Sequence, residues 1–271
     1  MKFCIVGAGA IGGYVGAKLA AAGEDVTFIA RWKNLDAIRT NGMTVKFKDG
    51  TVLEAKHAKA TDSFAAVGHV DCIILAVKAN QVEAIVHQLE PLYGPKTTVI
   101  TMQNGIPFWY FHKHGGNLQG PRVNAVDPTG VCAETIDPNR IIGCVVYPAA
   151  ELVAPGVVQH IEGDRFPLGE IDGTISNRVK DLSDVFAKSG LKAPVLDNIR
   201  NEIWLKLWGN LTFNPISALT HATLQDICEF PLSRELAASM MKEAQAVAEK
   251  LGASFRVTLE KRIEGAAKVG K

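Results

Sequence analysis

The sequence has little net charge, no paired cysteine pattern and no long uninterrupted apolar run. Each of these absences argues against a particular class of protein. The formal net charge of +1 over 271 residues gives no electrostatic reason to expect a nucleic-acid or anionic-membrane partner. The five cysteines are scattered and never occur in C-x-x-C spacing. This pattern favours reduced thiols in a cytoplasmic protein over a disulfide framework or a zinc site, so we expect no bound metal.

Two further absences concern membranes and export. The apolar stretch 203–219 is shorter than a membrane span and contains Lys206, Asn210, Asn214 and Pro215, so we expect a buried helix there. The first predicted strand begins at residue 2, so we expect no signal peptide. With 47% hydrophobic and 21% charged residues, the composition is ordinary for a globular protein, and we expect a cytoplasmic location.

The most informative feature is a glycine-rich segment directly after the first apolar run. Residues Lys2–Val6 predict a strand, and a G-x-G-x-x-G motif follows it. The first glycine permits a sharp turn, the second lets a pyrophosphate approach the backbone, and the third allows the next helix to pack closely. Such a motif also occurs in chance loops, but here a helix predicted from Ile11 to Ala22 follows it. We therefore predict a dinucleotide site that includes Gly7, Gly9, Ala10, Ile11 and Gly12.

The second predicted strand, Asp25–Ala30, indicates which dinucleotide is bound. An NAD site usually has an acidic residue at the carboxyl end of this strand, where it bonds the adenosine ribose. This chain has Arg31 there, and a guanidinium suits a 2′-phosphate that an acid would repel. The alternative is that Arg31 is an ordinary charged residue in a loop, with no role in binding. We predict NADPH/NADP⁺ as the cofactor.

Alternating strand-like and helix-like runs in the first half predict a Rossmann-type doubly wound parallel sheet. Its further strands are expected at Asp71–Val77 and Thr97–Met102, with a helix over Gln81–Leu92 and a small hairpin at Gly42–Phe47 and Thr51–His57. Short β-like pieces at Ile141–Pro148, Val157–Ile161 and Phe166–Gly169 read as antiparallel strands that extend the sheet.

Helical segments follow, expected at Thr174–Ser189, Asn198–Ala218 and Pro231–Leu251. The composition changes near residue 173. We therefore predict an NADP-binding domain over residues 1–172 and an all-helical substrate and catalytic domain over residues 173–271.

The segment Gly105–Gly130 carries several aromatic residues and glycines together with His112 and His114. Histidines two residues apart do not share a helix face, and no cysteine or acidic pattern completes a metal site. A loop over the cleft is therefore favoured over a metal site. Whether Trp109 and His112 form a lid or simply pack is open.

Two groups of polar residues could carry chemistry. Lys78 and Asn104 each follow an apolar run, so they are expected at the carboxyl edge of the sheet where ligands bind, although a solvated strand end or turn would look the same. The residues Glu202, Lys206, Asn210 and Asn214 recur every four positions, which places them on one slowly winding stripe of a helix that is otherwise apolar. A buried lysine there needs a partner or a task. The alternative is an exposed Glu202–Lys206 surface pair.

Together these features resemble the 2-dehydropantoate 2-reductase (ketopantoate reductase) family over most of the chain. The resemblance is carried by the glycine motif, Arg31, Val77-Lys78-Ala79, Gln103-Asn104-Gly105 and the segment from Trp204-Leu205-Lys206-Leu207 to Asn210 and Asn214-Pro215. It implies NADPH-dependent reduction of ketopantoate to pantoate, for pantothenate and coenzyme A synthesis. It further implies that Lys206 is the catalytic proton donor and that Asn210, Asn214 and Asn104 bind substrate. Lys78 and Asn104 would also line the nicotinamide cleft.

One departure concerns the end of the chain. Family members usually continue past this point with a glutamate that helps to position the substrate or the lysine, and Glu260 and Glu264 lie too early to replace it. We therefore expect a chain with a shortened helical domain that still binds the cofactor, and whether it turns over fully is left open. Two alternatives stay open: a reductase of another bulky 2-keto acid and a non-catalytic NADP(H)-binding sensor. The sequence leaves the oligomeric state open as well, a homodimer being one option.

Overall fold

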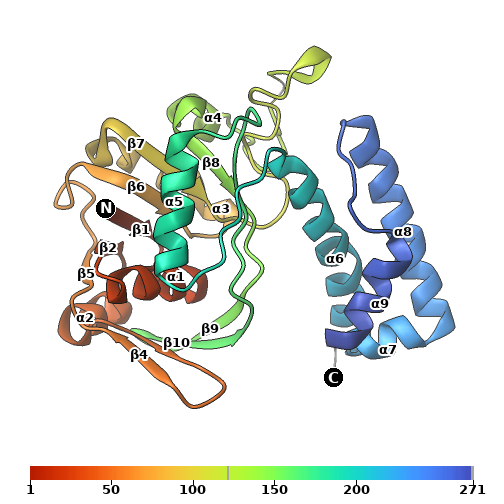
Figure 1. Ribbon diagram of the computed structural model, residues 1–271, viewed down its shortest axis with the longest axis horizontal. Helices are drawn as coiled ribbons and strands as arrows, with labels where there is room; N and C mark the ends of the chain where they lie inside the picture. Colours follow the sequence, from red (N-terminus) through yellow and green to blue (C-terminus); the bar gives the residue numbers. More distant parts are fainter. Residues whose placement is uncertain (121, 270–271) are drawn as a thin grey trace. The chain divides into compact units, whose positions relative to one another are not determined.

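The computed structural model describes residues 1–120 and 122–269. The chain forms two compact units, Met1–Ile199 and Arg200–Lys271. The first unit is a mixed α/β structure built on a largely parallel sheet, and the second is helical (Figure 1). This confirms the predicted fold class.

The main sheet of the first unit has the strand order β11-β8-β7-β6-β1-β2-β5. From β8 to β5 every pairing is parallel, and β11 runs antiparallel to β8. The strands span Lys2–Val6 (β1), Asp25–Ile29 (β2), Lys59–Thr61 (β5), Val70–Leu75 (β6), Tyr93–Thr101 (β7), Ile141–Cys144 (β8) and Leu168–Glu170 (β11). Successive residues of β1 are buried on both of its faces, as expected for a sheet covered on both sides.

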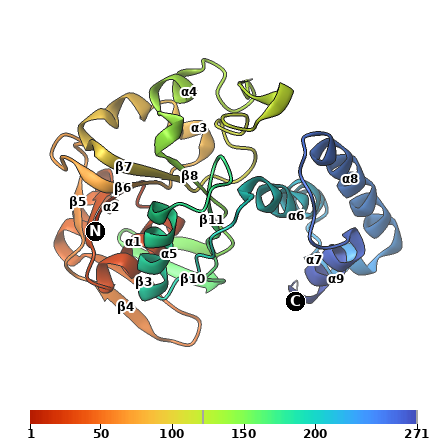
Figure 2. The ribbon, with the colours of Figure 1, turned by 45° about the horizontal axis from the view of Figure 1, so that its top comes forward.

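Helix α1 (Ala10–Ala21) lies between the main sheet and a second sheet of order β4-β3-β10-β9 (Figures 1 and 2). The second sheet comprises β3 (Met43–Lys46), β4 (Val52–Ala55), β9 (Ala149–Ala154) and β10 (Val157–Glu162). Its strands β3 and β10 pair in parallel although more than a hundred residues separate them. On α1, Tyr14 stacks on His160 of β10 at 4.7 Å between ring centroids.

The predicted hairpin at Gly42–Phe47 and Thr51–His57 is present as the antiparallel pair β3 and β4. The later β-rich region differs from the prediction. Strand β8 pairs in parallel with β7, and β10 belongs to the second sheet, so only β11 extends the main sheet in antiparallel fashion. The reason is that α1 is apolar on two faces, and β3, β9 and β10 cover the face that the main sheet leaves open.

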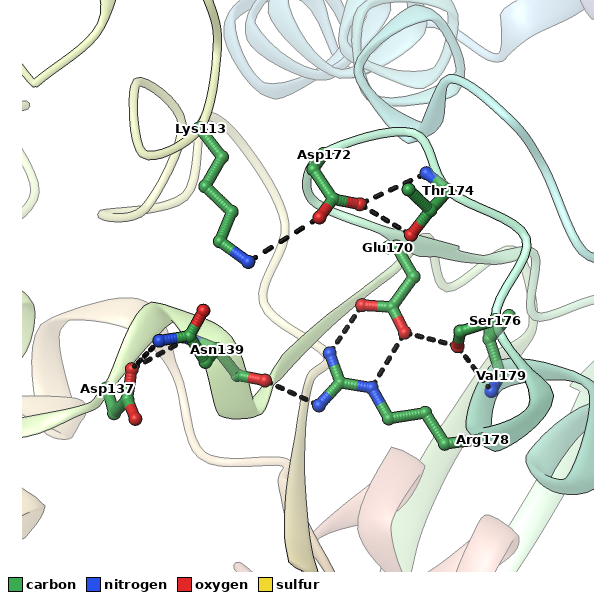
Figure 3. A network of polar contacts seen from close by, with 9 residues as sticks. All are labelled: Lys113, Asp137, Asn139, Glu170, Asp172, Thr174, Ser176, Arg178 and Val179. Carbon is green, nitrogen blue, oxygen red and sulfur yellow. Dashed lines mark hydrogen bonds and ion pairs between the residues drawn. The ribbon is translucent and has the colours of Figure 1, made fainter.

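Helix α5 (Asn177–Lys188) belongs to the first unit, so the contacts divide the chain after Ile199 and not after residue 172. Its side chains Val179, Leu182 and Phe186 are buried in the same core as α1. The polar network of Figure 3 holds the start of α5 against β11.

Arg178 and Glu170 are the centre of this network. Glu170 on β11 is buried, and its carboxylate accepts hydrogen bonds from Arg178 Nε at 2.7 Å and from Arg178 Nη2 (Figure 3). Ser176, the N-cap residue of α5, donates to the same carboxylate at 2.5 Å. The hydrogen bonds to Glu170 raise the pKa of Arg178 above its ordinary value, against a smaller opposing effect of burial.

The remaining helical segments of the first unit are short. Helix α2 spans Trp32–Asn41 and α4 spans Val131–Thr135. The predicted helix Gln81–Leu92 is instead helix α3 (Ala79–Val82) followed by 3₁₀ turns at Val86–Gln88 and Glu90–Leu92. Pro91 lies inside the last turn, where its ring cannot continue a regular helix.

The second unit contains α6 (Ile199–Thr220, from Arg200 onward), α7 (Leu224–Glu229), α8 (Pro231–Lys250) and α9 (Leu259–Val269). Trp208 of α6 lies at the centre of its core, where its indole N–H donates to Met241 O at 3.0 Å and its ring stacks on Phe255 at 4.0 Å. Within the described residues, no helix is both long and apolar enough to cross a membrane.

Candidate functional site

The glycine motif forms the turn between β1 and α1, and its three glycines meet different surroundings. Gly7 has φ +107°, and a Cβ there would lie 2.8 Å from Val77 Cγ1. A Cβ on Gly12 would lie 2.0 Å from the carbonyl oxygen of Gly7. A Cβ on Gly9 would meet no atom within 4 Å. Gly7 and Gly12 therefore serve the fold, whereas Gly9 borders open space.

Gly9 is also the N-cap residue of α1, and it has no side chain that could accept hydrogen bonds from the first-turn amides. These amides begin with Ala10 and Ile11 and carry the positive end of the helix dipole. An anionic group that approached over Gly9 would meet both the amides and the open space. The backbone of this turn therefore fits the pyrophosphate of a dinucleotide.

A cavity of about 430 Å³ opens at this turn. Its lining brings together the glycine turn, the end of β2, the start of α2 and the segment after β6. Its lining residues include Gly7, Gly9, Arg31, Trp32, Asn34 and Gln81. The cavity thus lies at the carboxyl ends of the central strands, where open α/β sheets bind their ligands.

Arg31 lies where the sequence places it, directly after β2. It is the N-cap residue of α2, its side chain is exposed, and it lines the cavity together with Gly7 and Gly9. A guanidinium in this position can pair with a phosphate in two parallel hydrogen bonds.

Asn34 also lines the cavity, although its local sequence does not single it out. Its Nδ2 donates to Ala8 O at 2.7 Å, and its Oδ1 accepts from Gly156 N at 2.7 Å. One half-buried amide therefore joins α2, the glycine turn and the β9–β10 turn of the second sheet. Both hydrogen-bond partners are distant in sequence. The one sequence signal for this role is an asparagine near the predicted start of a helix.

Lys78 and Asn104 are exposed and follow the adjacent parallel strands β6 and β7, as predicted. Gln103 joins these strand ends because its Nε2 donates to Leu75 O at 2.8 Å and to Val77 O at 3.0 Å. Within the described part of the chain, the cavity lining includes Val77 and Gln81 but neither Lys78 nor Asn104. The structure thus brings these two residues to the same sheet edge, outside the wall of the cavity.

The predicted polar stripe lies on α6, in the second unit. Lys206 and Asn210 are half-buried and Asn214 is exposed. Glu202 is only 3% exposed, and its carboxylate accepts hydrogen bonds from Arg256 Nη2 at 3.2 Å and Nε at 3.3 Å. The alternative of an exposed Glu202–Lys206 surface pair therefore does not describe this helix, since Glu202 is buried.

The loop after β7 packs its large aromatic side chains. Trp109 is 1% exposed and donates from Nε1 to Thr101 Oγ1 at 2.9 Å, and Tyr110 is 1% exposed. These rings are part of the core of the first unit, and packing accounts for Trp109. His112, two residues after Tyr110 in the sequence, is half-buried.

Burial keeps the thiols of Cys4 and Cys132 inactive. All five cysteines are reduced thiols, and all five are buried. Burial raises the pKa of Cys4 and of Cys132 to about 12. A thiolate is the reactive form, so these side chains remain protonated and inert at neutral pH. Among residues 1–120 and 122–269, no group of three or more histidine, cysteine, aspartate or glutamate side chains could hold a metal ion.

Comparison with known proteins gives the site its context. The family described as "Ketopantoate reductase PanE/ApbA" matches residues 3–109, and "Ketopantoate reductase PanE/ApbA C terminal" matches residues 198–269. A 2-dehydropantoate 2-reductase of Mesorhizobium japonicum is 50% identical over the whole of this chain, which covers 83% of that relative. The chain belongs to the ketopantoate reductase family.

Solved structures of this reductase family have the same fold. A Ralstonia solanacearum structure assigned to the ketopantoate reductases is 40% identical with a TM-score of 0.94, over 100% of this chain and 83% of that one. The 2-dehydropantoate 2-reductase of Geobacter metallireducens is 27% identical with a TM-score of 0.83, over 100% and 83%. A D-mandelate dehydrogenase solved with NADH and anilino(oxo)acetate, 23% identical with a TM-score of 0.81 over 99% and 79%, shares the fold.

Proposed function

We propose that this chain reduces the 2-keto group of ketopantoate to the hydroxyl group of pantoate, with NADPH as the hydride donor, in the cytoplasm. The observation that carries the proposal is 50% identity over the full chain to a 2-dehydropantoate 2-reductase. The open space above Gly9, with Arg31 on the same cavity wall, supports a phosphorylated dinucleotide as the cofactor.

The residues of the first unit would hold the cofactor. The amides of Ala10 and Ile11 would bind the pyrophosphate over Gly9, and Gly7 and Gly12 keep this turn in shape. Arg31 would pair with the 2′-phosphate, because a guanidinium matches phosphate geometry and is always charged. Lys78 and Asn104, at the sheet edge that Gln103 joins, would border the nicotinamide end. When bound, NADPH supplies the hydride.

The residues of α6 would act on the substrate. Lys206 would donate a hydrogen bond to the keto oxygen and then supply the proton there, which stabilises the negative charge that develops on that oxygen. Asn210 and Asn214 follow it at four-residue intervals on the same stripe and would orient the 2-keto acid. Glu202 lies on the same stripe, in the first turn of α6. Its carboxylate is bound by Arg256, which would hold this turn of the helix in place.

The test follows NADPH consumption by the purified chain with ketopantoate, beside parallel reactions with other bulky 2-keto acids and with NADH. We expect turnover that favours ketopantoate and NADPH. Faster turnover of another 2-keto acid would reassign the substrate, and NADPH binding without any turnover would favour a sensor.

Two variants test the residue roles. We expect Lys206→Ala to lower kcat by about 10²- to 10⁴-fold, the range of general acid catalysis, while the Kd for NADPH stays nearly unchanged. Arg31→Asp should weaken NADPH far more than NADH, because only NADPH has the extra phosphate. A loss of NADPH affinity with unchanged turnover in Lys206→Ala, or equal losses of both cofactors in Arg31→Asp, would contradict these roles.

A further inference from the structure

Trp32 is a large apolar side chain left open to solvent at the wall of the cavity. Its exposed fraction is 81%, whereas Trp109 and Trp208 are at most 1% exposed in the cores of their units. A single exposed apolar residue is common and needs no explanation. Trp32 differs because it lines the same cavity as Gly9 and Arg31.

The backbone of Trp32 is also unusual. Its φ is +52°, in the left-handed region that bulky side chains rarely adopt. Such a conformation costs free energy, and it persists only where the surrounding structure imposes it, frequently at ligand sites. Here it occurs at the first residue of α2, directly after Arg31.

Asn34, two residues after Trp32, anchors the backbone of this turn. Its two hydrogen bonds at 2.7 Å join the first turn of α2 to Ala8 O in the glycine turn and to Gly156 N. The backbone that carries Trp32 is therefore held at a fixed place relative to the pyrophosphate site. An exposed ring on a fixed backbone can bind a flat ligand with little further loss of conformational freedom.

We propose that the indole of Trp32 is the platform on which the adenine ring of the cofactor stacks. The inference rests on the proposed dinucleotide site and identifies a further cofactor-binding residue within it. If the pyrophosphate lies over Gly9 and the ribose phosphate at Arg31, the base is attached to that same ribose. The neighbouring exposed ring on the cavity wall is Trp32. Aromatic rings bind bases through their π faces.

The experiment separates the two halves of the cofactor. Calorimetry would measure the Kd of NADPH, of adenosine 2′,5′-bisphosphate and of reduced nicotinamide mononucleotide for the wild type, Trp32→Ala and Trp32→Phe. From the range for base stacking on aromatic side chains, we expect Trp32→Ala to weaken NADPH and the bisphosphate by roughly 5- to 150-fold. The mononucleotide affinity should not change, and Trp32→Phe should restore most of the lost binding.

Val52→Ala is the matched control, because Val52 is also exposed (54%) and lies outside the cavity lining. It should bind all three ligands as the wild type does. Two results would show that adenine does not stack on Trp32 while the proposed function stands. In the first, Trp32→Ala binds the bisphosphate as tightly as the wild type. In the second, it loses as much affinity for the mononucleotide as for the bisphosphate. If the wild type itself binds neither NADPH nor the bisphosphate, the proposed function fails and this inference fails with it.

Discussion

The same added methyl group should destabilise the fold at Gly12 but weaken only cofactor binding at Gly9. In Gly12→Ala the new Cβ would lie 2.0 Å from Gly7 O and 2.9 Å from Ala76 Cβ. Overpacking costs about 1–3 kcal/mol where side chains can move, and here the neighbour is a backbone carbonyl. We therefore expect the first unit of Gly12→Ala to lose about 3 kcal/mol or more of its free energy of unfolding.

Gly9→Ala should leave the fold nearly unchanged. A Cβ there meets nothing within 4 Å, and Gly9 has φ −79° and ψ −161°, an extended conformation open to alanine. Alanine is a poorer N-cap than glycine, which lowers stability. It also reduces the entropy of the unfolded chain, which stabilises the fold by about 0.4–1 kcal/mol. These effects oppose each other, so we expect a net change within about 1 kcal/mol.

The same Gly9→Ala change should weaken the binding of the cofactor. The added methyl would occupy the space through which a pyrophosphate approaches the first-turn amides of α1, so we expect NADPH affinity to fall at least about tenfold, or 1.4 kcal/mol. Urea denaturation followed by circular dichroism measures the stability of both variants, and calorimetry measures the Kd for NADPH. Unchanged NADPH affinity in Gly9→Ala, or a stable Gly12→Ala, would refute this reading of the turn.

Three further predictions concern side chains outside the glycine motif. Asn34→Ala removes two hydrogen bonds, one of them to Ala8 O, and should lower the free energy of unfolding by about 1–3 kcal/mol and weaken NADPH, as denaturation and titration would show. Arg256→Ala leaves the buried Glu202 without this partner, and because Arg256 is itself exposed we expect a loss of about 1–2 kcal/mol, below the value for a fully buried pair, again measured in urea. The Tyr93 hydroxyl is buried with no hydrogen-bond partner among the described residues, and burial raises its pKa to about 12. Because the unfolded state ionises first, near pH 10, stability should be full below that pH and fall between pH 10 and 12. Tyr93→Phe should lessen that fall without weakening the protein at pH 7, and a steeper alkaline loss would contradict this.

Local sequence patterns are sufficient to predict the strands at the centre of the parallel sheet. The buried strands β1, β2, β6 and β7 were predicted within a few residues of their bounds, because each is a short apolar run bounded by polar or turn residues. The glycine motif and Arg31 were also placed correctly relative to the strands, since their positions depend on the chain directly beside them.

Long-range pairing accounts for most of what the sequence could not give. The parallel pairing of β3 with β10 joins Thr44 to Val157, and no local pattern indicates such a partner. The roles of Asn34 and Gln103 likewise depend on backbone atoms that are brought near only by the fold. The division after Ile199 depends on α5 packing into the first core, whereas the composition changes earlier, near residue 173.

The covering of α1 on two faces explains why its sequence is richer in glycine than a dinucleotide alone requires. A Cβ on Gly16 would lie 2.4 Å from Phe28 in the main sheet, whereas on Gly13 the extra Cβ would lie 2.8 Å from Val158 in the second sheet. Small residues on both faces let the two sheets approach the helix closely. Because the helix is held from both sides, the amides at its N-terminus are fixed before any ligand arrives. A cofactor that binds there meets a site that is already ordered, and it loses less of its binding free energy to ordering the protein.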